Sequence, residues 1–349
     1  MINSRFDLPA DPSIKKILII KWSAMGDLVI ATAAMEDLHR AFPDARIDLH
    51  TTRPYRALFE KDHRLSRVLT DNVRSFSGIL AWLRSVRQGR YDLIVDLQSN
   101  QRSRTLMAIL YLLGWAPPYR VGTHPEFPYT ISSGVGRIKI SAFEIHQRAL
   151  AAAGIEPLTP RPCLSVPETS VRNARRLQAE HGLHPGRYAI FFPGSQAAGY
   201  LKRWGGDSYA ALGQALVERG LEKIGLIGGP DDRDACNAIE QTLEAPWLVN
   251  LCGATEMLDI VPLCAEAKLI VGNDTGTSHI ASATDTPMLV ICGPTDPLRV
   301  KPVGEQIGAI QADIDCKNCY KKQCAKDHRC MKAVTVEMVI AKLQEMQSL

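Results

Sequence analysis

The chain has 349 residues, of which 46% are hydrophobic, 22% charged and 6% aromatic. This composition is typical of a globular protein and excludes a disordered chain, a collagen-like repeat and a coiled coil. Residues 1–150 carry seven more basic than acidic side chains. Residues 151–349 carry three more acidic than basic side chains. That imbalance suits an anionic ligand or membrane surface near the first half, although a scattered, solvated surface gives the same count. No dense basic run is present, so we expect no nucleic-acid partner.

The apolar segments are too short for a secreted or membrane-spanning chain. The first residues lack the apolar stretch of a signal peptide, and the longest apolar run, 105–116, falls short of the ~20 residues of a transmembrane helix. We therefore expect a cytoplasmic protein in which this run forms a buried helix. Contact with a membrane interface is the alternative, because Arg104 and Arg120 flank the run.

Short apolar segments alternate with helically spaced ones along the first half. A strand is predicted at 16–21, followed by a tight loop and a helix that carries Leu28, Ala31, Met35 and Leu38. Further strands are predicted at 47–49, 68–69 and 92–95, the last before a helix through 106–112. This alternation predicts a parallel sheet with helices on both faces.

Four prolines between 157 and 167 mark a domain boundary. Beyond it, strands are predicted at 188–192, 223–227, 269–273 and 288–292, each with a glycine at or near its end. We expect an α/β protein of two doubly wound domains, 1–165 and 166–349, that face each other across a cleft and bind ligands outside the carboxyl ends of their strands. A last helix is predicted at 335–347, with Thr335 as its N-cap. One arrangement that we consider is that this helix packs back on the N-terminal domain.

The strongest motif is GNDTGTSH at 272–279, which leaves a buried strand and opens a helix of small residues. A helix start exposes N–H groups that favour a phosphate. Gly276 allows close approach of the backbone, Thr275 offers a hydroxyl donor, and Asp274 can accept from sugar hydroxyls. Either Asp274 or Thr275 can equally be a simple N-cap, and His279 either faces the phosphate or fills the core.

Two further loops carry candidate groups. Lys202 follows the predicted strand end at 192–195 closely enough to reach a ligand there. A lysine at such a place can neutralise a departing diphosphate. The alternative is an ordinary solvated lysine. The motif KWSAMGD at 21–27 places Asp27 in the first turn of a helix, as a base or as an N-cap. The signatures GxGxxG in the first loop, GxxxxGK[ST], HExxH and GxSxG are absent from the sequence.

Together these motifs resemble glycosyltransferase family 9, the bacterial lipopolysaccharide heptosyltransferases. The resemblance lies in KxSxMGD at 21–27, PGS at 193–195 with KRW at 202–204, GGPDD at 228–232, and GNDTG at 272–276 leading to GPTDP at 293–297. It covers nearly the whole chain and departs at Thr277 and Ser278, where relatives often carry proline and a larger apolar residue. It implies a GT-B fold and an inverting transfer of heptose from ADP-L-glycero-D-manno-heptose to the inner core of lipid A-linked oligosaccharide. The enzyme would work in peripheral contact with the cytoplasmic face of the inner membrane.

The resemblance also implies roles for residues. Asp27 matches the catalytic base and Lys202 the lysine on the departing diphosphate. The donor-binding residues implied are Ser195, Trp204, Asp232, Asp274, Thr275, Gly276 and His279, and the acceptor candidates are Arg53, Gln98, Arg102 and Arg120. No cofactor is implied for catalysis. A protein acceptor, another nucleotide sugar and a catalytically silent nucleotide-sugar-binding homologue are the alternatives, and the full motif around Asp27 favours an enzyme.

A cysteine cluster stands apart from these motifs. Cys316, Cys319, Cys324 and Cys330, with His328 nearby, place four thiols within fifteen residues. Four thiolates can hold zinc or iron, and protein-modifying relatives of the family hold iron with cysteines, yet the spacing is not that of a zinc ribbon. A structural metal, reduced thiols and a disulfide all remain open.

Overall fold

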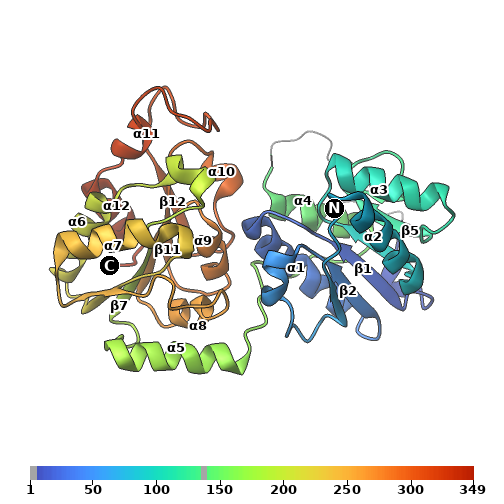
Figure 1. Cartoon of the computed structure of the whole chain (residues 1–349), viewed down its shortest axis with the longest axis horizontal. Coiled ribbons are helices and arrows are strands. Elements are labelled where there is room, and N and C mark those ends of the chain that lie inside the picture. The colour runs from blue at the N-terminus through green and yellow to red at the C-terminus, as the bar shows by residue number, and fades with distance from the viewer. Residues whose placement is uncertain (1–5, 135–139) are drawn as a thin grey trace. The chain divides into compact units, whose positions relative to one another are not determined.

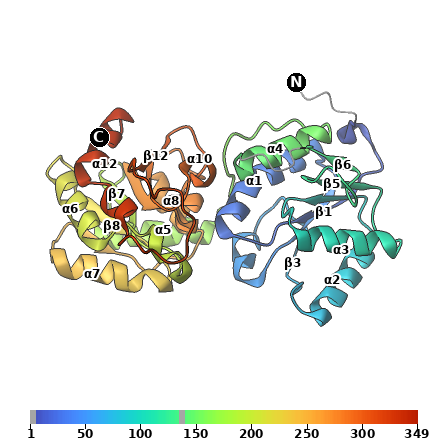
Figure 2. The ribbon, with the colours of Figure 1, turned by 90° about the horizontal axis from the view of Figure 1, so that it is seen from above.

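The computed structural model describes residues 6–134 and 140–349 and divides the chain into two compact units, Met1–Ser165 and Val166–Leu349 (Figure 1). Each unit contains a six-stranded sheet in which all neighbouring strands run parallel. Helices cover both faces of each sheet, as the views in Figures 1 and 2 show. The predicted α/β class with two doubly wound sheets is therefore confirmed.

The N-terminal unit has the strand order β3-β2-β1-β4-β5-β6. Its strands are β1 (Lys16–Ile20), β2 (Arg46–His50), β3 (Arg67–Leu69), β4 (Leu93–Asp96), β5 (Tyr119–Gly122) and β6 (Ile131–Ser132). Its helices are α1 (Met25–Ala41), α2 (Phe76–Gly89), α3 (Gln101–Leu112) and α4 (Ala142–Ala152), with short 3-10 turns η1 (Leu8–Ala10) and η2 (Arg53–Leu58). The order reverses between β1 and β4, and the carboxyl ends of these two strands are where doubly wound sheets bind ligands.

The C-terminal unit repeats this topology as β12-β11-β10-β7-β8-β9. Its strands are β7 (Tyr188–Phe192), β8 (Lys223–Leu226), β9 (Leu248–Asn250), β10 (Leu269–Asn273), β11 (Met288–Cys292) and β12 (Ile307–Gln311). Its helices and 3-10 turns are α5 (Glu168–His181), η3 (Ala197–Lys202), α6 (Gly206–Val217), η4 (Pro230–Asp232), α7 (Arg233–Leu243), α8 (Ile260–Ala265), α9 (Gly276–Ala281), α10 (Pro297–Val300), α11 (Arg329–Lys332) and α12 (Val336–Glu345). Here the order reverses between β7 and β10, which makes the ends of those strands the corresponding site.

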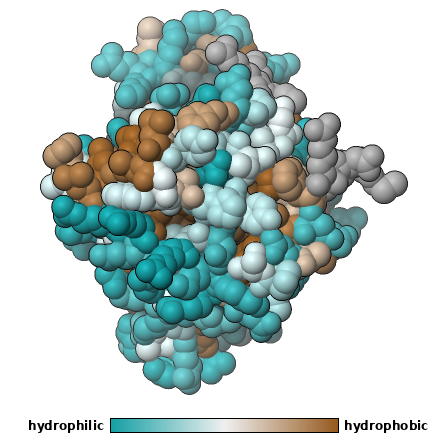
Figure 3. Space-filling view, turned by 90° about the vertical axis from the view of Figure 1, so that its right-hand side faces the viewer, coloured by the Kyte–Doolittle hydropathy of each residue, from teal (hydrophilic) through white to brown (hydrophobic). Residues whose placement is uncertain are grey.

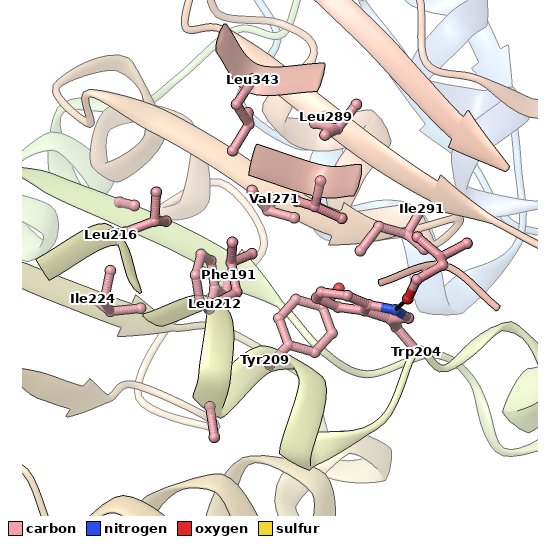
Figure 4. Packing of buried hydrophobic residues seen from close by; sticks show 14 of the residues in the cluster. Phe191, Trp204, Tyr209, Leu212, Leu216, Ile224, Val271, Leu289, Ile291 and Leu343 are labelled. Carbon is pink, nitrogen blue, oxygen red and sulfur yellow. Dashed lines mark hydrogen bonds between the residues drawn. The ribbon is translucent and has the colours of Figure 1, made fainter. Parts of the chain in front are cut away.

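Each unit has its own apolar core. In the N-terminal unit, α2 and α3 share a cluster with β1 and β4 that includes the fully buried Trp82 and Met107. In the C-terminal unit, Phe191, Tyr209 and Leu343 belong to a cluster that joins β7, α6 and α12 (Figure 4). The apolar face of α12, which we considered for packing back on the N-terminal domain, is part of this second core.

The segment before the boundary at residue 165 is tied to α1. One oxygen of the buried Asp37 carboxylate accepts from the N–H groups of Leu158 and Thr159 and, at 2.6 Å, from the Thr159 hydroxyl. Further on, the N–H of Cys163 donates to Thr32 Oγ1 at 2.9 Å. These bonds fix the proline-rich segment to the N-terminal unit up to residue 163.

The run 105–116 was expected to be a buried helix, and this is only partly right. Leu106, Met107 and Leu110 on α3 are buried, but Tyr111, Leu112 and Leu113 are exposed. The run therefore forms the end of an amphipathic helix and the turn after it. Among the described residues, no helix is both long enough and apolar enough to span a bilayer.

Candidate functional site

Asp27 lies near the point where the strand order of the N-terminal sheet reverses, between β1 and β4. It occupies the first turn of α1, directly after β1, and its half-buried carboxylate accepts through Oδ2 from the N–H of Ala24 at 3.3 Å. The N-cap residue of α1 is Ala24, and Asp27 is the third helical residue, bonded back to the Ala24 N–H through one oxygen only. The N-cap expected at Asp27 is therefore wrong, and its role as a base stays a prediction.

A buried cation that the sequence analysis did not select lies near this carboxylate. Lys21, only 4% exposed, follows β1, and its Nζ donates to the carbonyl of Leu97 at 3.0 Å. Burial lowers the pKa of Lys21, whereas the charges of Asp27 and Asp96 act to raise it. A lysine directly after an apolar strand is unusual, and this feature of the sequence could have identified Lys21 as a candidate.

His146 on α4 shares the same carbonyl. Its Nε2 lies 3.2 Å from Leu97 O, so Nε2 carries the proton, because a carbonyl oxygen can only accept. Burial and the nearby Lys21 lower the pKa of His146 to about 3. The ring is therefore neutral at physiological pH and supports the segment that follows β4.

Gln98 holds the loop that leads to Asp27. Its Oε1 accepts from the N–H groups of Trp22 at 2.8 Å and Ser23 at 3.1 Å. The backbone N–H of Gln98 in turn donates to the buried Asp96 carboxylate at 3.0 Å. Gln98, expected to bind acceptor, therefore positions the 22–24 loop through its amide oxygen.

The three arginines expected at the acceptor lie in different places. Arg53 begins η2 after β2 and Arg102 lies in the first turn of α3 after β4; both are exposed at the carboxyl edge of the sheet. Arg120 is the second residue of β5, away from that edge, and its buried guanidinium donates to the carbonyls of Pro117, Pro118 and Pro128. Its geometry assigns Arg120 a structural role in place of the acceptor contact that we expected.

In the C-terminal unit, the structure brings together Lys202 and Asp274. Lys202 Nζ lies 2.7 Å from Asp274 Oδ2, and the Thr295 hydroxyl donates to the same oxygen at 3.0 Å. The three residues follow β7, β10 and β11, which are neighbours in the sheet. Asp274 is 6% exposed while the Lys202 side chain is 33% exposed, so the cation remains open to solvent and to an anion.

Asn273, the last residue of β10, holds the loops around this pair. Its Nδ2 donates to the carbonyls of Pro193 and Gly194, and its Oδ1 accepts from the N–H of Trp204 and the hydroxyl of Tyr209. The side chain is fully buried, and all four bonds measure between 2.7 and 3.2 Å. Nothing in the local sequence indicates these contacts, because an asparagine at the end of a strand has no pattern that distinguishes it.

Asp232 and Ser195 also lie in this region, both mainly engaged with protein groups. Asp232 Oδ2 accepts from the N–H of Gly229 at 2.9 Å, and Arg203 lies 3.7 Å from its other oxygen. A Cβ on Gly194 would lie 1.9 Å from that oxygen, so only glycine fits there. Burial raises the pKa of Asp232, against the lowering by the Gly229 N–H and the Arg203 charge. The Ser195 hydroxyl donates to Gly199 O at 2.8 Å.

Trp204 was expected at the donor site, but its side chain is part of the core. The indole N–H donates to the carbonyl of Val334 at 2.7 Å, the dashed bond in Figure 4, and the ring meets Tyr209 edge-on with centroids 5.1 Å apart. The Trp204 side chain therefore anchors the loop that carries Lys202 to the core of the C-terminal unit.

The remaining candidates of the GNDTGTSH motif lie in α9 or at its N-cap. Thr275 is its N-cap residue without a side-chain capping bond, and Gly276 is its first residue. His279 is 7% exposed, on a helix of only six residues. The Ser278 hydroxyl donates to Asn273 O at 2.7 Å, which fixes the turn between β10 and α9.

The cysteine segment braces the loop after β11. The N–H of Asn318 donates to Gly293 O, the N–H of Tyr320 to Pro294 O, and the Tyr320 hydroxyl accepts from the N–H of Asp296. Cys330 is buried, Cys316 half-buried, and Cys319 and Cys324 exposed, all as free thiols. Within residues 6–134 and 140–349, no three His, Cys, Asp or Glu side chains gather as a metal site would require.

Comparison with known proteins identifies the family. A model of glycosyltransferase family 9 (heptosyltransferase) matches residues 79–329. Lipopolysaccharide heptosyltransferase 2 of Salmonella typhimurium is 24% identical over 95% of this chain and 99% of its own length. The fold matches a family 9 glycosyltransferase from Veillonella parvula (TM-score 0.78, 20% identity, 95% and 97% of the two chains) and the ADP-heptose lps heptosyltransferase II of E. coli (TM-score 0.72, 23% identity, 95% and 98%). The chain belongs to glycosyltransferase family 9 and is a glycosyltransferase with the two-domain GT-B fold.

Proposed function

We propose that this enzyme transfers heptose from ADP-L-glycero-D-manno-heptose to the inner core of lipopolysaccharide, with inversion at the anomeric carbon. The family supports this proposal, as do the relatives along nearly the full length that are named lipopolysaccharide heptosyltransferases. The observation that carries it is that each sheet places a charged group suited to this reaction where its strand order reverses: Asp27 in one unit and Lys202 in the other.

In this proposal the N-terminal unit, 1–165, binds the acceptor and the C-terminal unit, 166–349, binds the donor. Arg53 and Arg102, exposed at the edge that carries Asp27, suit the phosphates and acidic sugars of a lipid A-linked oligosaccharide. Ser195, Asp274, Thr275, Gly276 and His279 surround the donor, while Trp204 and Asp232 support its loops. The enzyme acts at the cytoplasmic face of the inner membrane, where its acceptor is anchored.

The reaction is a single displacement. Asp27 accepts the proton of the acceptor hydroxyl as that oxygen forms a bond to the anomeric carbon of heptose. The bond between this carbon and the ADP oxygen breaks, its electron pair leaves with ADP, and Lys202 stabilises the charge that develops on the diphosphate. The step needs no metal, because a lysine supplies the positive charge.

The test measures ADP release with ADP-heptose and heptose-deficient lipopolysaccharide. We expect release that requires the acceptor, that falls by at least about 10²-fold in Asp27→Asn, and that is unchanged by EDTA. Asp44→Asn, an exposed aspartate beyond α1, is the matched control. ADP binding without release would point to another acceptor or donor sugar, and full activity of Asp27→Asn would overturn the assignment of the base.

A further inference from the structure

The end of α3 exposes large apolar side chains. Tyr111, Leu112 and Leu113 are 51%, 79% and 45% exposed, and Phe127 in the loop after β5 is 52% exposed. The rings of Tyr111 and Phe127 meet edge-on, with centroids 5.1 Å apart. We call these four side chains the apolar patch. Contiguous exposed groups of this kind mark a surface that binds a protein or a membrane.

The neighbouring helix α2 carries arginines beside this patch. Arg84 and Arg87 are exposed and continue the stripe that begins with the exposed Phe76 and Leu80, because spacings of four, four and three residues keep these side chains on one face. The guanidinium of Arg87 lies 4.7 Å from the ring centre of Trp115, just beyond α3. The basic end of α2 thus adjoins the apolar end of α3, and Figures 1 and 2 both show the two helices side by side.

The charge of this surface is mainly positive. Arg84, Arg87 and Arg90 are exposed on and just beyond α2, and Arg102 is exposed on α3. The exposed Glu126 beside Phe127 pairs with Arg104 at 3.0 Å, and Arg120 is buried. Figure 3 looks on this side of the N-terminal unit and shows hydrophobic side chains gathered next to a hydrophilic area. Aromatic and leucine side chains beside arginines are the pattern of proteins that lie on anionic membranes: the apolar groups enter the interface while guanidinium groups bind lipid phosphates.

We propose that the apolar patch, together with Arg84 and Arg87, is a docking surface for a membrane that contains anionic lipids. Leu112 and Leu113 enter the interface between headgroups and acyl chains, Tyr111 and Phe127 lie at headgroup level, and the two arginines bind phosphates. A second copy of this chain fits the surface less well, because a twofold contact would place arginines against arginines.

Docking here would assist the proposed function without depending on it. The stripe on α2 begins with Phe76, at the helix end that follows β3 and so lies at the sheet edge of Asp27. A membrane along this stripe keeps a lipid-anchored acceptor close to that edge. Vesicle binding itself needs neither donor nor acceptor, so its outcome is separate from that of the transferase assay.

The experiment is co-sedimentation of the full chain with vesicles of phosphatidylcholine alone or mixed with phosphatidylglycerol. We expect binding to the mixed vesicles that weakens at high salt. Leu112→Asn/Leu113→Asn and Arg84→Glu/Arg87→Glu should each lower the partition coefficient by about tenfold or more. The matched control is Leu158→Asn/Arg175→Glu, which changes an exposed leucine and an exposed arginine elsewhere and should bind as the wild type does.

All variants should melt at the wild-type temperature and retain ADP release with a detergent-solubilised acceptor, since the changed side chains lie outside the candidate site. Slower release only when the acceptor is embedded in vesicles would support docking in function. Equal binding of wild type and patch variants, or no binding by the wild type, would overturn the proposal. A wild-type dimer that the leucine variant converts to monomer would assign the patch to a second copy of the chain instead.

Discussion

Lys202 and Asp274 form an ion pair of 2.7 Å between the segments that follow two neighbouring strands, β7 and β10. Thr295, after the next strand, donates to the same carboxylate oxygen. The carboxylate thus holds the ammonium group in place before any anion arrives, and such preorganised charge is most effective when negative charge develops on a leaving group.

Removing this charge should slow the chemical step. Lys202→Met, which keeps the length of the side chain, should lower kcat by about 10²- to 10³-fold, whereas Lys202→Arg should retain much of it. Steady-state ADP release measures the effect. Lys223→Met, a lysine elsewhere in the same unit whose Nζ donates to Pro246 O, is the control. Loss of donor affinity with unchanged kcat would contradict the role and leave Lys202 as a binding residue only.

Asn273 should matter chiefly for stability. Asn273→Ala removes four hydrogen bonds and leaves the buried Tyr209 hydroxyl and the Trp204 N–H without this acceptor. We expect a loss of about 2–4 kcal/mol in the free energy of unfolding, measured by urea denaturation. Asn237→Ala, on the exposed side of α7, should cost no more than about 1 kcal/mol. Equal losses in the two variants would show that the Asn273 bonds contribute little.

The sequence predicted the strands at the centre of each sheet because these are continuous apolar runs, such as Tyr188–Phe192 and Met288–Cys292, whose every residue is buried. It did not predict β5, β6, β9 and β12, which lie toward the edges of the sheets. Two of them have only two or three residues, and most of β12 is half-buried, so their apolar pattern is weak.

A similar limit applies to the site. Asp27 and Asp274 were found because the residues that follow a parallel strand, up to the first turn of the next helix, must lie near the carboxyl edge of the sheet. This holds whichever way the side chain points. Whether a side chain faces that edge or the core depends on partners distant in sequence. Trp204 bonds to Val334, which is 130 residues away in the sequence, and this contact leaves no local pattern. The same reason explains why Asn273 was missed.

The cysteines should differ sharply in reactivity toward an alkylating reagent. The N–H groups of Lys326 and His328 point at Cys324 Sγ and lower the pKa of this exposed thiol, whereas burial raises the pKa of Cys236, Cys264 and Cys292. Because the thiolate is the reactive form, Cys324 should be labelled first and the three buried thiols only on unfolding. Mass spectrometry of timed samples measures the order.

This labelling also separates the three states left open for the cysteine cluster. Reduced thiols react at once, a disulfide reacts only after a reductant is added, and a metal-bound cluster reacts only after a chelator. Cys324→Ser should remove the fast phase. Rapid labelling of the buried Cys264 in the folded protein would contradict the burial on which the predicted order depends.

His146 makes stability depend on pH. The folded chain keeps this ring neutral down to a pKa of about 3, while the unfolded chain protonates it near 6.5, so the unfolded state binds more protons between these values. The contribution of His146 is therefore complete above pH 6.5 and declines as pH falls, by about 2 kcal/mol between pH 6.5 and 5. His50, whose pKa burial lowers to about 4, acts in the same direction.

Urea denaturation at pH 7 and pH 5 tests this. His146→Gln retains a donor for Leu97 O but does not titrate, so its free energy of unfolding should fall by about 2 kcal/mol less than that of the wild type over this range. His181→Gln, on the exposed end of α5, should keep the wild-type pH dependence. If His146→Gln lost as much stability as the wild type, His146 would have to be protonated in the folded chain at pH 5, and its neutral support of the segment beneath Asp27 would be disproved.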